Sequence, residues 1–416
     1  MKIVYFNYLH DLYDGSLGST IKAIELMSAL ENQGHEVKSF WLNARPAGGD
    51  ESSFSVRGSL KKRFDKYLHE PNQILRNIKY ISEEIQILRK EKPDLIISRL
   101  DVYLLSTLVL SKLKRIPWLL EADAPAVYES RKFLTHYAKL PYLDALIEKL
   151  NVRMADRIIV VSKEAKDYFL KYRLSEGKIH VVPNAVDVTK FHPGKESSLV
   201  TMKHQLQNKV VIGFVGSMHY WHGVSNLLKV LDAILSVDEK VVFMILGQGG
   251  AKEAEFKEFV AKKRYQDRVI LPGFVPHEEV PRYIAAMDIV LAPYPKLDFF
   301  YYSPMKIYEY LACGKAVVAS KIGQIQELIT DNYNGMLCEP GDIDQIIGKT
   351  QELVEDENLR NSIGKQAWES VSVHHTWVQR AEKISEICEM MVSRGSIPFT
   401  ISITKVQQDI VNIREL

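Results

Sequence analysis

Short apolar runs alternate with longer amphipathic stretches along most of the chain. The runs Lys2–Asn7, Leu95–Ser98 and Trp118–Glu121 have strand length and few polar positions, which is typical of strands buried on both faces of a parallel sheet. The stretch Thr20–Gln33 places apolar residues on one helical face and ends before Gly34. Strands that alternate with helices in this way predict an α/β fold with right-handed crossovers.

The alternation of strands and helices occurs twice, which predicts two domains. The polar stretch His192–Asn208 contains Pro and Gly, and the strand Val210–Val215 starts the second series. Both halves are expected to be Rossmann-like, with any ligand at the carboxyl ends of the strands. The expected limits are 1–195 for the first domain, 205–372 for the second, about 375–395 for a helix that packs back on the first, and 396–416 for a C-terminal tail.

The segment 301–320, YYSPMKIYEYLACGKAVVAS, predicts a helix followed by a buried strand. Ser303 is expected to be the N-cap residue, and Pro304 is expected to occupy the first helical position. The N-terminus of such a helix offers unpaired N–H groups and a positive dipole end to an anion such as phosphate. Those N–H groups belong to Met305, Lys306 and Ile307.

Two charged side chains of this helix suit particular parts of a nucleotide. The positive charge of Lys306 in the first turn opposes the helix dipole, and a bound diphosphate would remove that conflict. Glu309 lies on the same face, three residues further on, where its carboxylate could accept hydrogen bonds from a ribose diol. The alternative is an ordinary amphipathic helix with a surface Lys306–Glu309 pair, and the helix alone does not decide between the two.

Composition excludes several classes of protein. The 416 residues are 46% hydrophobic and 25% charged, as in an ordinary globular protein, and a net charge of +2 argues against a nucleic-acid partner. The three cysteines have no metal-ligand spacing, so reduced thiols and no metal site are expected. No apolar run approaches the ~20 residues of a membrane span and the N-terminus lacks a signal-peptide core, which predicts a cytoplasmic protein.

The charge is distributed unevenly between the two halves. Residues 1–195 contain 31 Lys and Arg against 24 Asp and Glu, a net of +7, and the remaining 23 against 28 give −5. Lys61, Lys62 and Arg63 form a basic run beside aromatic residues. A basic helix with an apolar face can lie on anionic lipid, which would place the protein at the inner face of the membrane. A solvated surface helix explains the same run equally well.

Eight short segments share their order and spacing with a known family. They are GHEV (Gly34–Val37), VVSKEAKDYF (Val160–Phe169), VVPNAVD (Val181–Asp187), GFVGSMHYWHG (Gly213–Gly223), ILGQGG (Ile245–Gly250), PGFVPHEEVPRYIAAMDIVLAPY (Pro272–Tyr294), SPMKIYEYLACGKAVVAS (Ser303–Ser320) and NGMLCEPGD (Asn334–Asp342). Over roughly residues 1–390 the chain thereby resembles the GT-B-fold glycosyltransferases of the retaining family 4. The resemblance implies transfer of a sugar from a nucleotide-sugar to a glycan, lipid-linked or small-molecule acceptor, with retention and without a metal or other cofactor.

The resemblance also assigns roles to residues of the second domain. Glu309 matches the glutamate that binds the donor ribose, and the helix start Ser303–Ile307 matches the element that holds the diphosphate. Gly273 and Phe274 match a loop near the nucleobase, and Gly216–Gly223 matches a second loop on the phosphate side.

In the first domain, the resemblance concerns the acceptor side and one loop. Gly18 matches a glycine loop that closes over the donor, and Glu121 stands where the family has a histidine near the acceptor. His10, Asp123 and His136 are further candidates for acceptor contact.

Three positions of the second domain depart from the family pattern. Tyr301 stands where the first glutamate of an E-x7-E pair is usual, and Ser217 and His222 stand where an Arg and a Lys usually clamp the diphosphate. Lys306 is expected to replace the missing cation. The expected catalytic residues are therefore Lys306, Glu309 and Tyr301.

Two other functions remain open on the sequence. One is a sugar-nucleotide epimerase or a phosphorylase on the same fold, which would need an acid–base pair that the sequence does not reveal. The other is a non-catalytic relative that acts as a partner subunit, suggested by Tyr301 and the missing clamp but opposed by the presence of Lys306 and Glu309. Donor sugar, base, acceptor and oligomeric state are not determined by the sequence.

Overall fold

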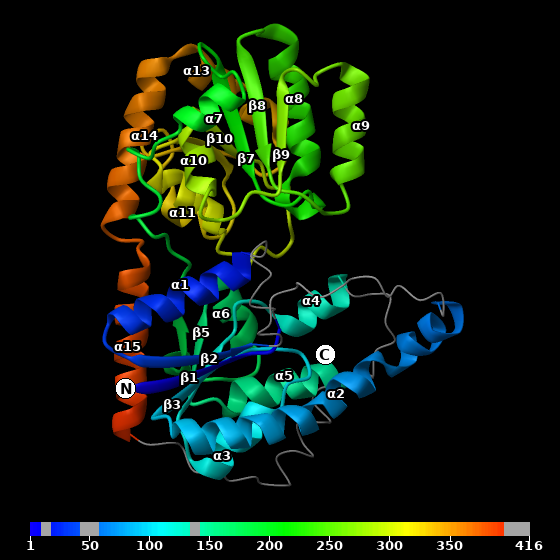
Figure 1. Cartoon of the computed structure of the whole chain (residues 1–416), viewed down its shortest axis with the longest axis vertical. Helices are drawn as coiled ribbons and strands as arrows, with labels where there is room; N and C mark the ends of the chain where they lie inside the picture. The colour runs from blue at the N-terminus through cyan, green and yellow to red at the C-terminus, as the bar shows by residue number, and fades with distance from the viewer. Residues whose placement is uncertain (10–17, 42–57, 134–141, 395–416) are drawn as a thin grey trace. The chain divides into compact units, whose positions relative to one another are not determined.

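The chain divides into two compact units. The computed structural model describes residues 1–9, 18–41, 58–133 and 142–394, and of residues 58–69, 133 and 394 only the backbone (Figure 1). Among the described residues, the N-terminal unit contains those of Met1–Pro183 and 381–394, and the C-terminal unit contains Asn184–Arg380. The second boundary falls inside helix α15 (Trp377–Arg394), so the chain returns to the N-terminal unit.

A parallel six-stranded sheet forms the centre of the N-terminal unit, in the order β2-β1-β3-β4-β5-β6. Its strands are β1 (Lys2–Asn7), β2 (Glu36–Trp41), β3 (Leu95–Arg99), β4 (Trp118–Glu121), β5 (Arg157–Val160) and β6 (Ile179–Val181). All residues of β3 and β4 are buried, which explains why apolar residues follow one another in both strands up to the polar ends Ser98, Arg99 and Glu121.

Helices lie on both faces of this sheet, with α1 on one side and α2 and α3 on the other (Figure 1). They are α1 (Gly18–Asn32), α2 (Gly58–Glu91), α3 (Ser106–Lys114), α4 (Ala126–Phe133), α5 (Leu143–Met154), α6 (Lys163–Leu170) and the 3-10 helix η1 (Glu176–Lys178). Helix α15 is bound to this unit by Lys383, which donates to the carbonyl of Val181 at 2.8 Å, and by a 2.8 Å contact between Ser385 and His35.

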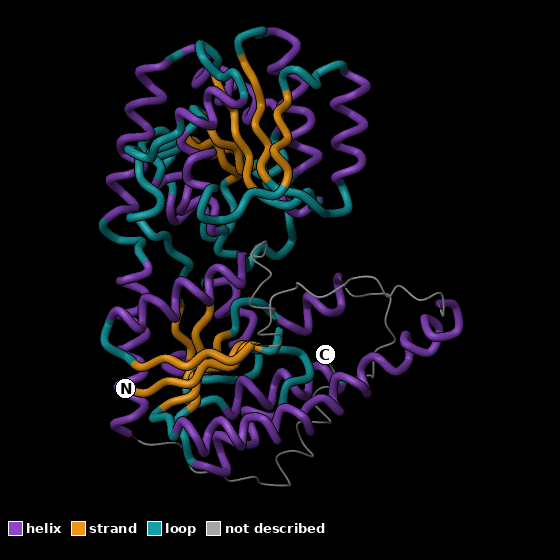
Figure 2. Tube along the Cα trace, in the orientation of Figure 1, coloured by secondary structure: helices purple, strands orange, loops and turns teal. Residues whose placement is uncertain are grey.

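The C-terminal unit is built around a second parallel sheet, in the order β12-β11-β10-β7-β8-β9 (Figure 2). Its strands are β7 (Val210–Val215), β8 (Val241–Leu246), β9 (Val269–Gly273), β10 (Ile289–Ala292), β11 (Ala316–Ser320) and β12 (Met336–Cys338). Its helices are α7 (Ser198–Lys203), η2 (Tyr220–His222), α8 (Val224–Val237), α9 (Glu253–Lys263), α10 (Val280–Ala285), α11 (Met305–Ala312), α12 (Ile325–Leu328), α13 (Ile343–Glu355) and α14 (Glu357–Ser372).

Two apolar clusters cover the two faces of this second sheet. Neighbouring residues of β7 belong to different clusters, because successive side chains of a strand point to opposite faces. Val211 packs in the cluster that contains residues of α10, α11 and α14, whereas Ile212 packs in the cluster that contains residues of α8, α9 and α13. The central strands are therefore buried on both sides, and helix α11 is held firmly against the sheet.

The structure confirms the predicted α/β fold with two Rossmann-like sheets. Strand β12 was not expected, since three apolar residues between polar neighbours give too short a pattern. The units divide at Pro183, about ten residues before the polar stretch His192–Asn208. The physical reason is that Val186 and Phe191 already belong to the core of the C-terminal unit.

Close backbone packing between α14 and the end of α11 generates the first prediction. A Cβ on Gly364 would lie 2.1 Å from the carbonyl oxygen of Gly314, so one helix must move away from the other. Gly364→Ala should therefore lower the free energy of unfolding by about 1–3 kcal/mol in urea titrations. Gly348→Ala in α13, where nothing lies within 4 Å, should raise it by about 0.5–1 kcal/mol. Equal effects of the two substitutions would contradict this packing.

Candidate active site

Helix α11 begins at the carboxyl edge of the C-terminal sheet, beside the point where the strand order reverses. That reversal lies between β10 and β7, and open α/β sheets bind ligands in the crevice at such a point. The phenol oxygen of Tyr310 in α11 accepts a hydrogen bond from the Val215 amide at 2.7 Å. The end of β7 and the helix α11 are thereby joined, which places the loop after β7 next to the helix.

The first turn of α11 differs in detail from the sequence prediction. Pro304, not Ser303, is the N-cap residue, and no side chain caps the helix. Ser303 instead accepts a hydrogen bond from the Asn184 amide at 2.9 Å, and its carbonyl accepts from the Asn184 side chain at 2.6 Å. The expectation that Ser303 caps the helix was wrong because this neighbouring segment, distant in sequence, occupies its hydroxyl.

Two backbone amides remain for an anion at this helix end. Met305 and Lys306 lie in the first turn, where amides have no acceptor within the helix. The Ile307 amide donates to the Pro304 carbonyl at 3.1 Å, so the expectation that it is free was wrong. The Ile307 side chain is completely buried in the core. The helix end can therefore present two amides, fewer than the sequence suggested.

Lys306 is the unusual residue of this region. Its side chain is buried, and its Nζ has no hydrogen-bond partner among the described residues. The amine lies 4.2 Å from the ring centre of Phe214 and 5.3 Å from that of Tyr294. Burial lowers the pKa of Lys306 to about 7, and the nearby Glu309 carboxylate only partly opposes this effect. The site thus holds a cation for which the described residues supply no anion in contact.

Three glycines end three neighbouring strands beside Lys306. The Gly216 amide donates to the Leu246 carbonyl at 2.9 Å, and the Gly247 amide donates to the Gly273 carbonyl at 3.2 Å. Gly216 has φ +142°, and a Cβ there would lie 3.1 Å from the Nζ of Lys306. A Cβ on Gly247 would lie 2.4 Å from the Gly216 carbonyl oxygen. A side chain at Gly216 would crowd the Lys306 amine, and one at Gly247 would collide with the Gly216 backbone, which explains glycine at these two positions.

The two residues that replace the usual cationic clamp do not restore its charge. The His222 Nδ1 lies 2.9 Å from the Ser217 carbonyl oxygen, to which a neutral imidazole donates from that nitrogen. Burial, together with the charge of Lys306, lowers the pKa of His222 to about 3. His222 is therefore neutral at pH 7 and stabilises the backbone of the loop. Contact of Ser217 or His222 with a diphosphate stays a prediction.

Glu309 has a partner that the sequence analysis missed. The Nε2 of His277 lies 2.9 Å from the Oε1 of Glu309, and the two side chains are only 19% and 7% exposed. His277 follows β9 and belongs to the segment VPHEEV, which the sequence analysis quoted without singling out its histidine. A lone histidine in a loop gives no signal of its own, since only the folded chain brings it to α11.

Tyr301 is buried, whereas Phe274 is exposed. Tyr301 is 1% exposed, and its ring lies 4.2 Å from that of Tyr302 and 5.2 Å from that of Phe299, measured between centres. Its contact with a donor sugar stays a prediction. Phe274, directly after Gly273, is 47% exposed, so its ring face is available for stacking on a nucleobase.

The N-terminal unit contains a buried cluster of four charges at its strand ends. The Lys22 amine contacts Glu121 at 2.6 Å and also Asp123, and the Arg99 guanidinium contacts Asp123 at 2.9 Å. The hydroxyl of Tyr5 donates to Glu121 at 2.7 Å. Two cations and two anions cancel within the cluster, which reduces the cost of burying them. Only Glu121 and Asp123 were singled out from the sequence.

This cluster limits which of the residues predicted to contact the acceptor are accessible. Glu121 is completely buried, so its carboxylate presents no surface to an acceptor in this structure, whereas the Asp123 side chain keeps 11% exposure. Gly18 is exposed and forms the first residue of α1. His10 and His136, together with the side chains of Lys61, Lys62 and Arg63, lie outside the described residues, and membrane contact stays a prediction.

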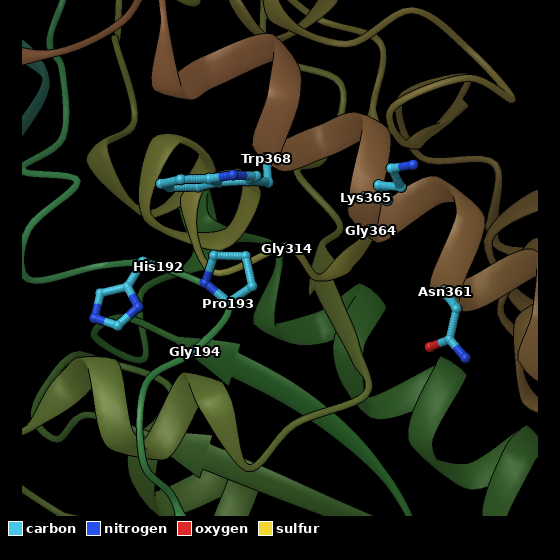
Figure 3. Close-up of a pocket in the computed structure, with 8 residues that line it drawn as sticks. All are labelled: His192, Pro193, Gly194, Gly314, Asn361, Gly364, Lys365 and Trp368. Carbon is cyan, nitrogen blue, oxygen red and sulfur yellow. The ribbon is translucent and has the colours of Figure 1, made fainter.

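A pocket of about 590 Å³ lies elsewhere on the C-terminal unit (Figure 3). Its lining residues are His192, Pro193, Gly194, Gly314, Asn361, Gly364, Lys365 and Trp368. In Figure 3 the ring of Trp368 lies over that of Pro193. Gly314 follows the C-terminus of α11, the negative end of the helix dipole, whereas Lys306 lies at the positive end. This pocket is therefore separate from the candidate site.

The described residues lack both a metal-ion site and a membrane-spanning helix. No group of three or more His, Cys, Asp or Glu is placed to hold a metal ion there. No helix in the described ranges is both long enough and apolar enough to pass through a bilayer.

Similarity to solved structures identifies the fold. Sucrose-phosphate synthase from Thermosynechococcus elongatus matches with a TM-score of 0.72 at 19% identity, over 95% of this chain and 100% of that chain. HepE from Anabaena, solved in complex with UDP, matches with a TM-score of 0.68 at 18% identity, over 94% and 100%. Two Rossmann-like units of this kind define the GT-B fold of glycosyltransferases.

Sequence comparison identifies the family. The model of "Glycosyl transferases group 1" matches residues 201–370, and that of "Glycosyltransferase Family 4" matches residues 18–190. The chain therefore belongs to the family of glycosyltransferases that these two models describe. An uncharacterised glycosyltransferase of Methanocaldococcus jannaschii is 26% identical over 257 residues, which are 61% of this chain. The match spans 64% of that relative, less than two thirds of its length.

The buried charge cluster of the N-terminal unit generates the second prediction. Lys22→Met would leave Glu121 and Asp123 with a single cation, and an uncompensated buried carboxylate is strongly destabilising. We expect the free energy of unfolding to fall by about 3–5 kcal/mol in denaturant titrations. The control is Lys114→Met on the exposed end of α3, which should change it by less than about 0.5 kcal/mol. A loss below about 1 kcal/mol in Lys22→Met would show that the cluster does not need this amine.

Proposed function

We propose that this chain transfers a sugar from a nucleotide-sugar to an acceptor hydroxyl, with the diphosphate of the donor at the N-terminus of α11. The observation that carries the proposal is Lys306, a buried amine without a hydrogen-bond partner among the described residues. A buried amine without a counter-ion loses its proton readily, and an anionic ligand in contact with it would restore its charge. The helix dipole and the amides of the first turn favour the same sign of ligand.

The residues around this helix end suit the diphosphate, the ribose and the base of a nucleotide. The long side chain of Lys306 lies beside Gly216, where a Cβ would approach its amine to 3.1 Å, and in this proposal the amine pairs with the donor diphosphate. Glu309 lies on the next turn of the same helix, where its carboxylate accepts hydrogen bonds from the ribose hydroxyls. Phe274 offers an exposed aromatic face for the base. Diphosphate, ribose and base thus each find a matching group in one unit.

The same groups can assist the chemical step. Cleavage of the bond between the anomeric carbon and the phosphate oxygen leaves negative charge on the diphosphate and positive charge on the sugar ring. Lys306 and the helix end stabilise the departing diphosphate, and such electrostatic stabilisation is often the largest contribution to catalysis. The leaving phosphate oxygen takes the proton of the acceptor hydroxyl as the new bond forms on the same face. The anomeric configuration is then retained, and no metal takes part.

The acceptor in this proposal is a glycan, a lipid-linked sugar or a small molecule that carries a free hydroxyl. The net charge of +7 in residues 1–195 favours an acceptor with a negative group, because like-sign repulsion is absent and approach is accelerated. Asp123, the outermost member of the buried cluster, is the described residue of this unit that we expect nearest the acceptor.

The third prediction concerns the pH dependence of nucleotide binding. With a pKa of about 7, most Lys306 is neutral at pH 8, so the protein must take up a proton to pair this residue with a diphosphate. The affinity for UDP should therefore fall about twofold between pH 6 and 7, about fivefold between pH 7 and 8 and about tenfold between pH 8 and 9. Calorimetry in buffers of different ionisation enthalpy should show the proton uptake directly.

Two controls accompany this titration. Lys306→Met should bind UDP weakly and without the slope, while its affinity for uridine, which carries no phosphate, should match that of the native protein. An equal loss for UDP and uridine would show that Lys306 acts only on the structure.

The fourth prediction concerns turnover. Native protein with a panel of nucleotide-sugars and with polyprenyl phosphate or soluble sugar acceptors should form a product whose anomeric configuration, determined by NMR, equals that of the donor. Glu309→Ala should bind the donor nucleotide about ten- to a hundredfold more weakly, the loss expected for hydrogen bonds to a charged group. An inverted product would contradict the mechanism. Nucleotide binding without any turnover would favour the non-catalytic relative.

A further inference from the structure

His277 makes a contact for which the proposed function gives no reason. Its Nε2 lies 2.9 Å from the Oε1 of Glu309, and because a carboxylate only accepts, Nε2 is the donor. The contact joins the segment after β9 to the middle of α11, across 32 positions of sequence. Since the side chains are only 19% and 7% exposed, little water competes for it.

The imidazole of His277 is held from a second side as well. Its ring centre lies 5.4 Å from that of Phe191, at an interplanar angle of 48°. Phe191 is 2% exposed and belongs to the core of the C-terminal unit. A histidine anchored in this way has little freedom to move, so its hydrogen bond restrains the position of Glu309 Oε1 and restricts rotation of the carboxylate.

A fixed carboxylate plane matters for recognition of a diol. Two adjacent hydroxyls must meet oxygen lone pairs in one defined geometry, and a carboxylate that rotates freely loses entropy when they bind. With Oε1 held by His277, the Oε2 of Glu309 and the outer lone pair of Oε1 keep one orientation before any ligand arrives. Such preorganisation by a supporting contact raises affinity without touching the ligand.

We propose that His277 is a positioning residue for ribose recognition, which holds the Glu309 carboxylate ready for the two hydroxyls of the donor nucleotide. This inference rests on the proposed function, because it takes Glu309 as the ribose-binding group. It differs from a purely structural role in one measurable respect. A structural role weakens every nucleotide equally, whereas positioning through Glu309 affects only nucleotides that have the two hydroxyls.

The test compares UDP with 2′,3′-dideoxyuridine 5′-diphosphate by isothermal titration. His277→Ala and His277→Asn should weaken UDP about five- to tenfold, less than Glu309→Ala, because they disturb the orientation of the carboxylate and leave its hydrogen bonds to the ribose in place. His277→Gln should stay within about twofold, because its amide nitrogen stands as far along the side chain as Nε2 of histidine, whereas that of asparagine corresponds to Nδ1. None of the three should change the affinity for the dideoxy nucleotide by more than about twofold.

Two controls separate positioning from folding. His204→Ala removes another imidazole of the same unit, which lies beside Tyr283 at 6.1 Å between ring centres, and should change neither affinity. In the Glu309→Ala background, His277→Ala should have no further effect on UDP, since a residue that acts through another loses its influence when the other is gone. Thermal unfolding of every variant shows which fraction is folded.

Each outcome decides between defined alternatives. Equal weakening of both nucleotides by His277→Ala, or an additive effect in the double variant, overturns the inference and leaves the proposed function intact. An unchanged affinity in His277→Ala also overturns it. If the native protein binds none of UDP, ADP, CDP and GDP, the proposed function fails and this inference fails with it. If one of the others binds more tightly than UDP, that nucleotide and its dideoxy analogue serve as the pair.

Discussion

The buried positive charge of Lys306 is the constraint on which the candidate site depends. An amine removed from water without a paired anion is costly, and its lowered pKa expresses that cost. The charge also stands in the first turn of α11, where the helix dipole has the same sign. The ring faces of Phe214 and Tyr294 attract the positive charge of Lys306, but they offset only part of the cost of burying it. Packing of α11 against the sheet maintains this arrangement, and the proposed diphosphate would be the counter-ion that relieves it.

The two units treat buried charge in opposite ways. In the N-terminal unit, Lys22 and Arg99 meet Glu121 and Asp123 within one cluster, so the charges cancel inside the protein. Such a cluster adds rigidity at the strand ends and needs no ligand. In the C-terminal unit, Lys306 has no equivalent partner among the described residues. The difference explains why the second unit, and not the first, is expected to hold the anionic part of the donor.

The chemistry at α11 also depends on backbone geometry. Gly216 and Gly247 adopt φ of +142° and +125°, values that other residues rarely reach, and they lie so close that a Cβ on the second would meet the carbonyl of the first. The neutral His222 holds the same loop through the Ser217 carbonyl. Around Lys306, the protein thus provides a loop whose backbone conformation requires glycine and a carboxylate that is hydrogen-bonded to His277.

The sequence by itself determined the architecture and part of the site. Continuous apolar runs fix buried strands because burial on both faces is a local, periodic property, and strands such as β1, β4 and β7 have the limits the pattern predicts. Lys306 and Glu309 were found since both lie on one helix, at a spacing that defines one face. The pattern of apolar and polar positions could not predict contacts between segments that are distant in the chain. Three hydrogen-bonded pairs were decided only by the tertiary structure: Ser303 with Asn184, Glu309 with His277, and Glu121 with Lys22. Each pair forms because separate elements pack together, and such packing produces no periodic pattern in the sequence.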